Sequence, residues 1–290
     1  MKIGIDSYCY HRYFGEIYSG QKDPGIRWDL KAFLKHISGM PLEALALETC
    51  FLPSQEKEIL ACVSSLDLDV TFAWGHPDGF MGTNEAESLS DIKKYMMVSK
   101  EVGSHVMRIT GSSISYFSKP HRPQIELSVK CLKKLVPLAE TLSIKLAIEN
   151  HGDFFLHELL EIVERIDSPF LGITLDTGNC LRLKENPVDA IRLFKERIFI
   201  IHAKDLAPIE EQITDEPLTL ACVPAGQGIT DFKGIVHELH RFHFTGNILI
   251  EISRLHPDFE NLGETSVIEM GLAHLLTLRR EGVETYGARR

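Results

Sequence analysis

Four residues with metal-binding side chains follow apolar segments at similar intervals along the chain. They are Glu149, Asp176, His202 and Glu251, with separations of 27, 26 and 49 residues. An ionisable side chain is costly to bury unless it is paired or holds a metal, so four such positions need a common explanation. Three carboxylates and one imidazole suit Mn²⁺, Mg²⁺, Co²⁺ or Zn²⁺. We therefore predict that these four side chains bind one divalent metal ion.

Each of the four also has a structural explanation that needs no metal. Asp176 precedes Thr-Gly-Asn and could cap the helix that follows, and His202 alone could be a core histidine with satisfied hydrogen bonds. Glu149 and Glu251 could form buried ion pairs, with Arg108 as the partner. All of these explanations would have to hold together, so a shared metal site is favoured.

Two of the carboxylates also suggest a reaction. A divalent cation that binds adjacent oxygens of a hydroxy-carbonyl compound acidifies the neighbouring C–H bond and stabilises the resulting enediolate. Glu149 and Glu251 could remove and return the proton as an acid/base pair. The outcome would be epimerisation or isomerisation, our first hypothesis, or dehydration by loss of a β-hydroxyl, our second. A protein that binds carbohydrate without turnover is the third.

Eight short apolar segments alternate with segments of helical periodicity. Continuous apolar runs of this length are typical of parallel strands covered on both faces. Eight strand–helix units, spaced by about 36 residues, predict an α/β fold, a (β/α)8 TIM barrel forming one domain over residues 1–290. A doubly wound sheet is the alternative, but no glycine-rich phosphate turn follows an early strand. The expected strands are 2–6, 44–49, 70–74, 105–110, 145–150, 171–176, 198–205 and 247–252.

The predicted barrel would bring the four residues to one rim. Functional residues of such barrels gather where the strands end, and each of the four lies at or near a strand end. The glycine-rich segment 226–234 falls in the seventh strand–helix connection and is expected to be an active-site loop. The clearest helices are expected at 125–142, 156–166, 190–198 and 261–280.

Motifs around these positions resemble the xylose isomerase-like barrel superfamily, the sugar phosphate isomerase/epimerase family, over essentially the whole chain. They are E-N-H at 149–151, L-D-T-G-N at 175–179, H-A-K-D at 202–205, G-Q-G-x-x-D-F at 226–232 and I-E-I-S-R at 250–254. The superfamily includes ketose 3-epimerases, hydroxypyruvate isomerase, inosose dehydratase and 3-dehydroshikimate dehydratase. The resemblance implies a sugar or polyol substrate and the metal ligands Glu149, Asp176, His202 and Glu251.

The chain departs from the ketohexose 3-epimerases of that superfamily at three positions. Asn179 stands where they have a substrate-binding histidine, Phe155 replaces a glutamate and Pro208 replaces an arginine. The resemblance therefore implies the metal centre without the ketohexose clamp. The extra histidines of the related apurinic endonucleases are also missing, so DNA repair is not expected.

Further side chains near the strand ends are candidates for contact with the substrate. Asp6, Tyr8 and Glu48 could complete the rim, and Trp74 and Phe80 could form an apolar wall unless they belong to the core. The histidine-rich segment 237–243 is expected on a helix away from the site, because its first two histidines lack HExxH spacing. The predicted substrate-binding residues are His76, Arg108, Asn179, Lys204 and Asp205.

Composition limits the partners and the compartment. The 290 residues contain 31 Lys and Arg against 41 Asp and Glu, a formal net charge of −10. That charge disfavours binding to nucleic acid or anionic membranes. We see no apolar run long enough to span a bilayer and no signal peptide, and the six cysteines form no CxxC pair. Reduced thiols and a cytoplasmic location are therefore expected, and homo-oligomerisation remains open.

Overall fold

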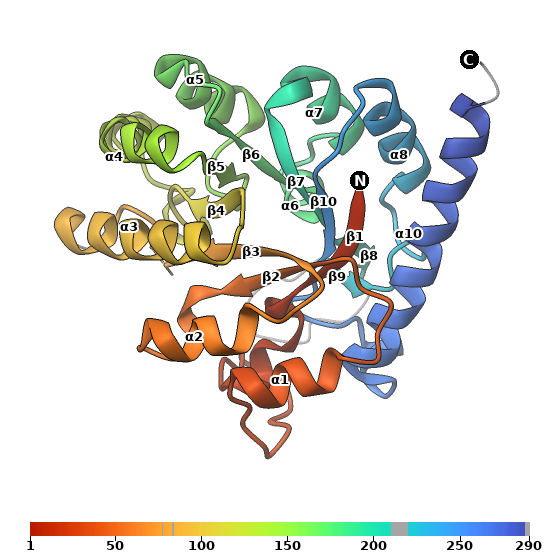
Figure 1. Cartoon of the computed structure of the whole chain (residues 1–290). Helices are drawn as coiled ribbons and strands as arrows, with labels where there is room; N and C mark the ends of the chain where they lie inside the picture. Colours follow the sequence, from red (N-terminus) through yellow and green to blue (C-terminus); the bar gives the residue numbers. More distant parts are fainter. Residues whose placement is uncertain (77, 83, 210–219, 288–290) are drawn as a thin grey trace.

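A computed structural model describes residues 1–76, 78–82, 84–209 and 220–287 of the chain. Eight parallel strands form a closed barrel, seen end-on in Figure 1, which confirms the predicted (β/α)8 fold. The strands are β1 (Lys2–Asp6), β2 (Ala44–Glu48), β3 (Asp69–Trp74), β4 (Val106–Thr110), β5 (Lys145–Glu149), β6 (Leu171–Asp176), β7 (Ile198–Ala203) and β10 (Asn247–Ile250). Around the barrel their order is β1-β10-β7-β6-β5-β4-β3-β2.

Helices surround this barrel, and Figure 1 shows the long α10 along one side. Their apolar faces pack against the outer faces of the strands in one large core that runs around the molecule. They are α1 (Leu30–Ile37), α2 (Glu56–Val63), α3 (Glu85–Glu101), α4 (His121–Leu142), α5 (Leu156–Ile166), α6 (Thr177–Arg182), α7 (Pro187–Phe194), α8 (Phe232–Arg241), α9 (Pro257–Glu260) and α10 (Gly263–Gly287).

The expected helices agree with the structure except near some ends. α5 has the predicted bounds, α4 begins four residues early, and α10 begins two residues late and continues to Gly287. The helix expected at 190–198 is α7, which starts at Pro187 because the Asn186 side chain accepts a hydrogen bond from the Val188 N–H at 2.8 Å. It ends at Phe194 because Lys195 has a positive φ of 48°.

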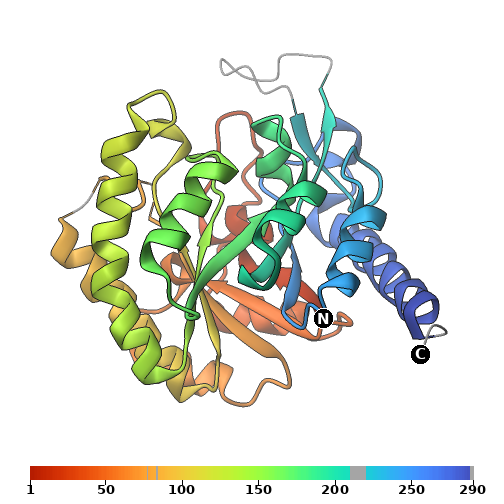
Figure 2. The same ribbon diagram turned by 90° about the horizontal axis from the view of Figure 1, so that it is seen from above.

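The strand expected at 198–205 is shorter than predicted. β7 ends at Ala203, and Asp205 instead begins β8 (Asp205–Pro208), which pairs antiparallel with β9 (Leu220–Val223). This hairpin lies at the opposite end of the barrel from the N-terminus, as Figure 2 shows. The sequence prediction was wrong here because an apolar run does not reveal where the chain leaves the barrel.

The pleat of the strands explains why polar side chains meet at one end of the barrel interior. Ala147, Ile200 and Leu249 belong to a small buried cluster that is separate from the main core. Side chains two residues apart on a strand point to the same face. Two residues further along these strands come Glu149, His202 and Glu251.

The structure bears on the cysteines and on the apolar segments of the chain. All six cysteines are free thiols. Among the residues that the structure describes, none of the helices has both the length and the apolar composition that a bilayer span requires.

Candidate metal centre

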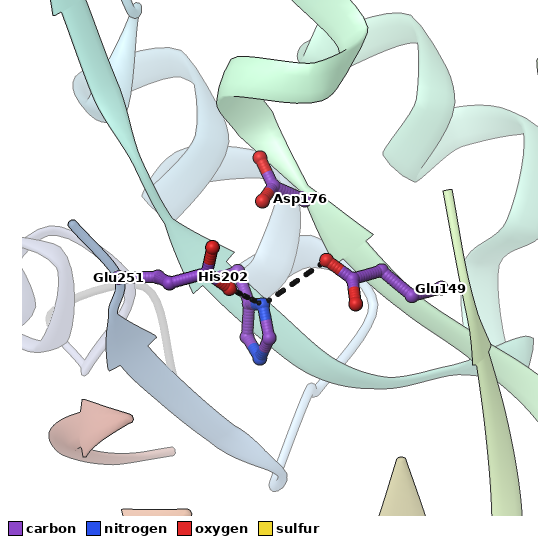
Figure 3. Close-up of side chains that lie close together, drawn as sticks. All are labelled: Glu149, Asp176, His202 and Glu251. Carbon is purple, nitrogen blue, oxygen red and sulfur yellow. Dashed lines mark ion pairs between the residues drawn. The ribbon is translucent and has the colours of Figure 1, made fainter. Parts of the chain in front are cut away.

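The four predicted ligands come together. Each offers one donor atom, and these atoms all lie within 4.8 Å of one another. The side chains extend from three neighbouring strands and from the residue that follows β10, and Figure 3 shows them directed toward a common space. The strand register explains this convergence, because Asp176 pairs with His202, which in turn pairs with Leu249, two residues before Glu251. All four side chains are buried.

Asp176 both caps a helix and faces the cluster. Its Oδ1 accepts a hydrogen bond from the Asn179 N–H at 2.8 Å, which caps α6, and its carboxylate also belongs to the donor cluster. Asn150 fixes this arrangement, because its side chain hydrogen-bonds the N–H and the C=O of Asp176 at 2.6 and 2.9 Å. The cap and the site role are therefore compatible.

The donor set fits a divalent cation. Within the described part of the chain, several of its buried atoms make no hydrogen bond of regular geometry: both carboxylate oxygens of Glu149, Oδ2 of Asp176, Nδ1 of His202 and Oε2 of Glu251. These atoms meet their neighbours in ion pairs alone, and buried charges are costly unless they are well paired. A divalent ion bound by three carboxylates and an imidazole would satisfy them.

Lys204 supplies a buried positive charge beside the cluster. Its Nζ lies 2.7 Å from Asp176 Oδ2 and 2.5 Å from Glu251 Oε1. Burial acts to lower the pKa of Lys204, but these two carboxylates outweigh it and raise the pKa above its usual value. A Cβ at position 178 would lie 2.7 Å from the Lys204 side chain, so a larger residue than glycine there would displace Lys204.

Arg108 is a second buried cation that contacts the cluster. Its guanidinium pairs with Glu48 and with Glu149, whose Oε2 lies 3.2 Å from Nε. The ion-pair explanation considered for Glu149 is therefore also correct. Burial acts to raise the pKa of Glu149, but Arg108 and His202 outweigh it and lower the pKa to about 2.

His202 lies between carboxylates on both sides of its ring. Nδ1 is 3.4 Å from Glu149 Oε1 and 2.5 Å from Glu251 Oε2, whereas Nε2 is 3.7 Å from Asp6 Oδ2. Burial lowers the pKa of His202, but Glu251 and Glu149 outweigh it and raise the pKa well above its usual value. Burial likewise raises the pKa of Glu251, but Lys204 and His202 bring it well below its usual range.

A cavity of about 360 Å³ opens over the cluster at the strand ends. Of the four donors, Glu251 lines it, together with Arg108 and His76 from the predicted substrate-binding set. His76 also accepts a hydrogen bond from the Asp78 N–H at 3.1 Å, so it both lines the cavity and holds the turn that follows β3. Tyr8 and Glu48, expected to complete the rim, line the cavity as well.

Three residues predicted to bind substrate, Asn179, Lys204 and Asp205, do not line this cavity, and Lys204 contacts the donor cluster instead. The Asp205 carboxylate accepts hydrogen bonds from the N–H groups of Gly226, Gly228 and Thr230 at 2.8 to 3.0 Å. It therefore shapes the segment 226–230 instead of facing the cavity. Asn179 is buried in the first turn of α6.

The remaining wall candidates belong to the core. The rings of Trp74 and Phe80 stack with centroids 5.7 Å apart, and both are buried away from the cavity.

The segment 226–234, expected to be a loop throughout, is a loop only in its first part, because its last residues begin α8 at Phe232. The histidine-rich segment falls largely on α8, as expected.

Sequence reasoning missed several cavity residues. His151, whose Nδ1 has no hydrogen bond to the described residues, is the third residue of the E-N-H motif and could have been found from it. Glu16, Tyr18 and Cys50 also line the cavity, and nothing in their spacing distinguishes them. Tyr18 and Glu16 lie in an irregular segment after the first strand, where periodicity gives no information.

A family model described as "Xylose isomerase-like TIM barrel" matches residues 51–275, more than three quarters of the chain. The chain belongs to this family. The matched segment includes all four clustered donors. The resemblance found from the motifs is thereby confirmed.

Curated relatives of the chain include proteins named as enzymes of several chemistries. A 3-oxo-isoapionate decarboxylase of Pectobacterium atrosepticum is 36% identical over 31% of this chain and 33% of its own length. SgbU of Escherichia coli, provisionally named as an L-ribulose-5-phosphate 3-epimerase, is 25% identical over 62% of both chains. An inosose dehydratase of Clostridium botulinum is 28% identical over 41% of this chain and 44% of its own. The chain thus spans from one third to about three fifths of the length of these relatives.

Solved structures share the whole fold at lower sequence identity. A D-tagatose 3-epimerase-like protein superposes with a TM-score of 0.70 at 20% identity, covering 98% of this chain and 100% of the other. The IOLI protein, solved with a bound zinc atom, gives a TM-score of 0.69 at 17% identity and covers 97% and 99%. At these identities the two structures establish the fold alone.

Proposed function

We propose that the chain is a divalent-metal-dependent isomerase or epimerase of a sugar or a related polyhydroxy carbonyl compound. The observation that carries this proposal is the convergence of four buried donor atoms beneath a cavity of about 360 Å³. The ligands would be Glu149, Asp176, His202 and Glu251. A cavity of this size accommodates a small polyhydroxy molecule.

The residues around the cavity support proton transfer to and from such a substrate. When bound, a divalent cation supplies a Lewis acid that acidifies a C–H bond beside a carbonyl group and stabilises the developing charge. Glu251 lines the cavity and would exchange a proton with the substrate, while Glu149 lies behind it against Arg108. Arg108 and Lys204 keep these two carboxylates ionised and oriented.

Isomerisation and epimerisation make different demands on the two glutamates. Both pKa values are lowered, so both carboxylates begin as bases. Isomerisation needs one carboxylate that removes a proton from one carbon and returns it to the next. Epimerisation needs a second carboxyl group that starts protonated on the opposite face. The two reactions therefore share proton removal by a carboxylate and differ in the group that returns the proton.

A lyase is the second candidate. An inosose dehydratase and a decarboxylase are among the relatives. Dehydration and decarboxylation, like isomerisation, require stabilisation of negative charge beside a carbonyl group. The same buried donors could therefore serve a lyase or an isomerase.

Solvent exchange tests the proposal across a range of candidate substrates. Protein loaded with Mn²⁺ is incubated in D₂O with a panel of ketoses, aldoses and inososes, followed by NMR. We expect deuterium at a carbon beside the carbonyl group of one compound, loss of exchange after chelation, and at least about 100-fold slower exchange in Glu251→Gln. Glu238→Gln is the matched control, because Glu238 is equally buried but pairs with Arg192 and Arg241 on the outside of the barrel.

Three results would contradict this assignment. Full exchange by the chelated protein would remove the metal from the mechanism. Exchange in none of the compounds would exclude the isomerase and the epimerase. Formation of a conjugated product with new ultraviolet absorbance, or of carbon dioxide, would identify a lyase instead.

A further inference from the structure

Asp6 is a buried carboxylate at the end of β1 that the proposed chemistry does not use. Its side chain is inaccessible to solvent. Oδ1 accepts a hydrogen bond from the Tyr8 N–H at 2.8 Å and so caps the short 3-10 helix Ser7–Phe14. Oδ2 has no hydrogen-bond partner among the residues that the structure describes. A buried carboxylate oxygen without a donor is costly and calls for a functional explanation.

The atom that faces Asp6 Oδ2 is His202 Nε2, and it also lacks a hydrogen bond to the described residues. The two atoms lie 3.7 Å apart. The other ring nitrogen, Nδ1, is directed at Glu149 and Glu251, as the dashed lines in Figure 3 show. The ring therefore presents one nitrogen to the donor cluster and the other to Asp6.

Arg108 is the cation that could compete for Asp6. Its guanidinium acts on Asp6 electrostatically, but its ion pairs are with Glu48 and Glu149. The Nε2–H of His202 is the donor that can reach Asp6 Oδ2 instead. The separation of 3.7 Å exceeds a hydrogen bond, and a movement of about 1 Å would close it.

We propose that Asp6 is a positioning residue for His202 in the metal site. Its Oδ2 accepts the Nε2–H of the neutral imidazole and so holds the tautomer whose Nδ1 lone pair faces the metal. This inference rests on the proposed metal site. A carboxylate on the distal nitrogen of a metal-binding histidine fixes the tautomer and the ring orientation and makes the ligand more basic.

The contacts of Asp6 make two substitutions behave differently. In Asp6→Asn, the single side-chain oxygen stays with the Tyr8 N–H, so the amide NH₂ faces His202 Nε2. An NH₂ group donates only, so it favours the tautomer with the proton on Nδ1, which cannot bind a metal. In Asp6→Ala, neither tautomer is favoured. Both substitutions remove the carboxylate, and asparagine keeps the cap and the shape that alanine loses, so weaker metal binding by Asp6→Asn than by Asp6→Ala can come only from the tautomer.

Titration with Co²⁺ tests the inference. We expect the wild-type protein to bind Co²⁺ most tightly, Asp6→Ala more weakly, and Asp6→Asn weakest, at least about tenfold below the wild type. The visible Co²⁺ spectrum should change in both variants. Thermal unfolding of the metal-free proteins should give the other order, with Asp6→Asn more stable than Asp6→Ala, because asparagine keeps the helix cap.

Other outcomes separate this inference from the metal proposal. If the wild-type protein binds no Co²⁺, the metal site itself is refuted, and the role of Asp6 with it. If the wild type binds Co²⁺ and Asp6→Asn binds as tightly as the wild type or more tightly than Asp6→Ala, the positioning role is refuted while the metal site stands. A structural role predicts this second order, since asparagine preserves both cap and shape.

Discussion

Two buried cations determine the charge balance of the site. Arg108 and Lys204 each contact two carboxylates, and every one of these groups is nearly inaccessible to solvent. Burying an ion is costly unless a partner of opposite charge is held close by. Each cation therefore stabilises ligands that would otherwise repel one another without a metal. The role of Arg108 in ion pairing is easier to test apart from metal binding, because one of its partners, Glu48, lies outside the donor set.

Replacement of Arg108 by methionine should destabilise the metal-free protein strongly. Glu48 and Glu149 would stay buried without their shared cation, so we expect the free energy of unfolding to fall by about 3–5 kcal/mol. Urea denaturation in the presence of chelator measures this free energy of unfolding. Arg122→Met is the control, because Arg122 pairs with Glu126 and Glu161 on the surface and should cost less than about 1 kcal/mol. Equal midpoints for the two variants would contradict the role given to Arg108.

At the scale of the elements, an ion pair joins the beginnings of the neighbouring helices α4 and α5. His121 opens α4, and its Nδ1 lies 2.8 Å from Oε2 of Glu158 in the first turn of α5. Its Nε2 lies 2.7 Å from the Phe117 carbonyl oxygen, so both ring nitrogens donate when the imidazole is protonated. Burial lowers the pKa of His121, but Glu158 and the Phe117 carbonyl outweigh it and raise the pKa above 6.5.

The His121–Glu158 pair should make stability depend on pH. Because the pKa of His121 is higher in the folded than in the unfolded chain, its contribution is complete below pH 6.5 and is lost as the pH rises through the folded-state value. We expect the wild type to exceed His121→Gln in free energy of unfolding by about 0.5 kcal/mol at pH 6, with the difference shrinking by pH 9. Denaturation at both pH values tests this; a difference that grows with pH would refute it.

The whole barrel determines whether the donors meet. Glu149 ends β5 and Glu251 directly follows β10, and in the closed sheet β6 and β7 lie between these two strands. A bound ion would therefore link four consecutive positions of the barrel, from β5 to β10. Since these donors are close together only in the folded chain, a metal that binds them must stabilise the fold.

Metal removal should consequently lower the thermal stability of the protein. At a free Mn²⁺ concentration of 100 times Kd, we expect about 2.7 kcal/mol of stabilisation over the chelated protein. Asp176→Asn should lose this difference, and Asp189→Asn, an exposed position on α7, should keep it. Scanning calorimetry with and without chelator measures the effect. An unchanged melting temperature in the wild type, or a full metal response in Asp176→Asn, would contradict the site.

The amino-acid sequence by itself determined where the barrel strands lie along the chain and which four residues are the donors of the candidate site. Strand periodicity is local, and a charged residue at the end of an apolar run is visible without any contact. The same reasoning located α5 to the residue, because its apolar stripe is regular. Where the signal was a cap, as at Asn186, the start of the helix was missed.

Only the tertiary structure decided which groups face each other. Lys204 and Asp205 are neighbours in sequence, yet one contacts Asp176 and Glu251 while the other holds the 226–230 segment. Nothing in the sequence assigns these directions, because successive side chains point to opposite sides and the exit of the chain from the barrel sets which side is which. The approach of Asp6 to His202 likewise depends on closure of the barrel, since it joins residues that lie far apart in the chain.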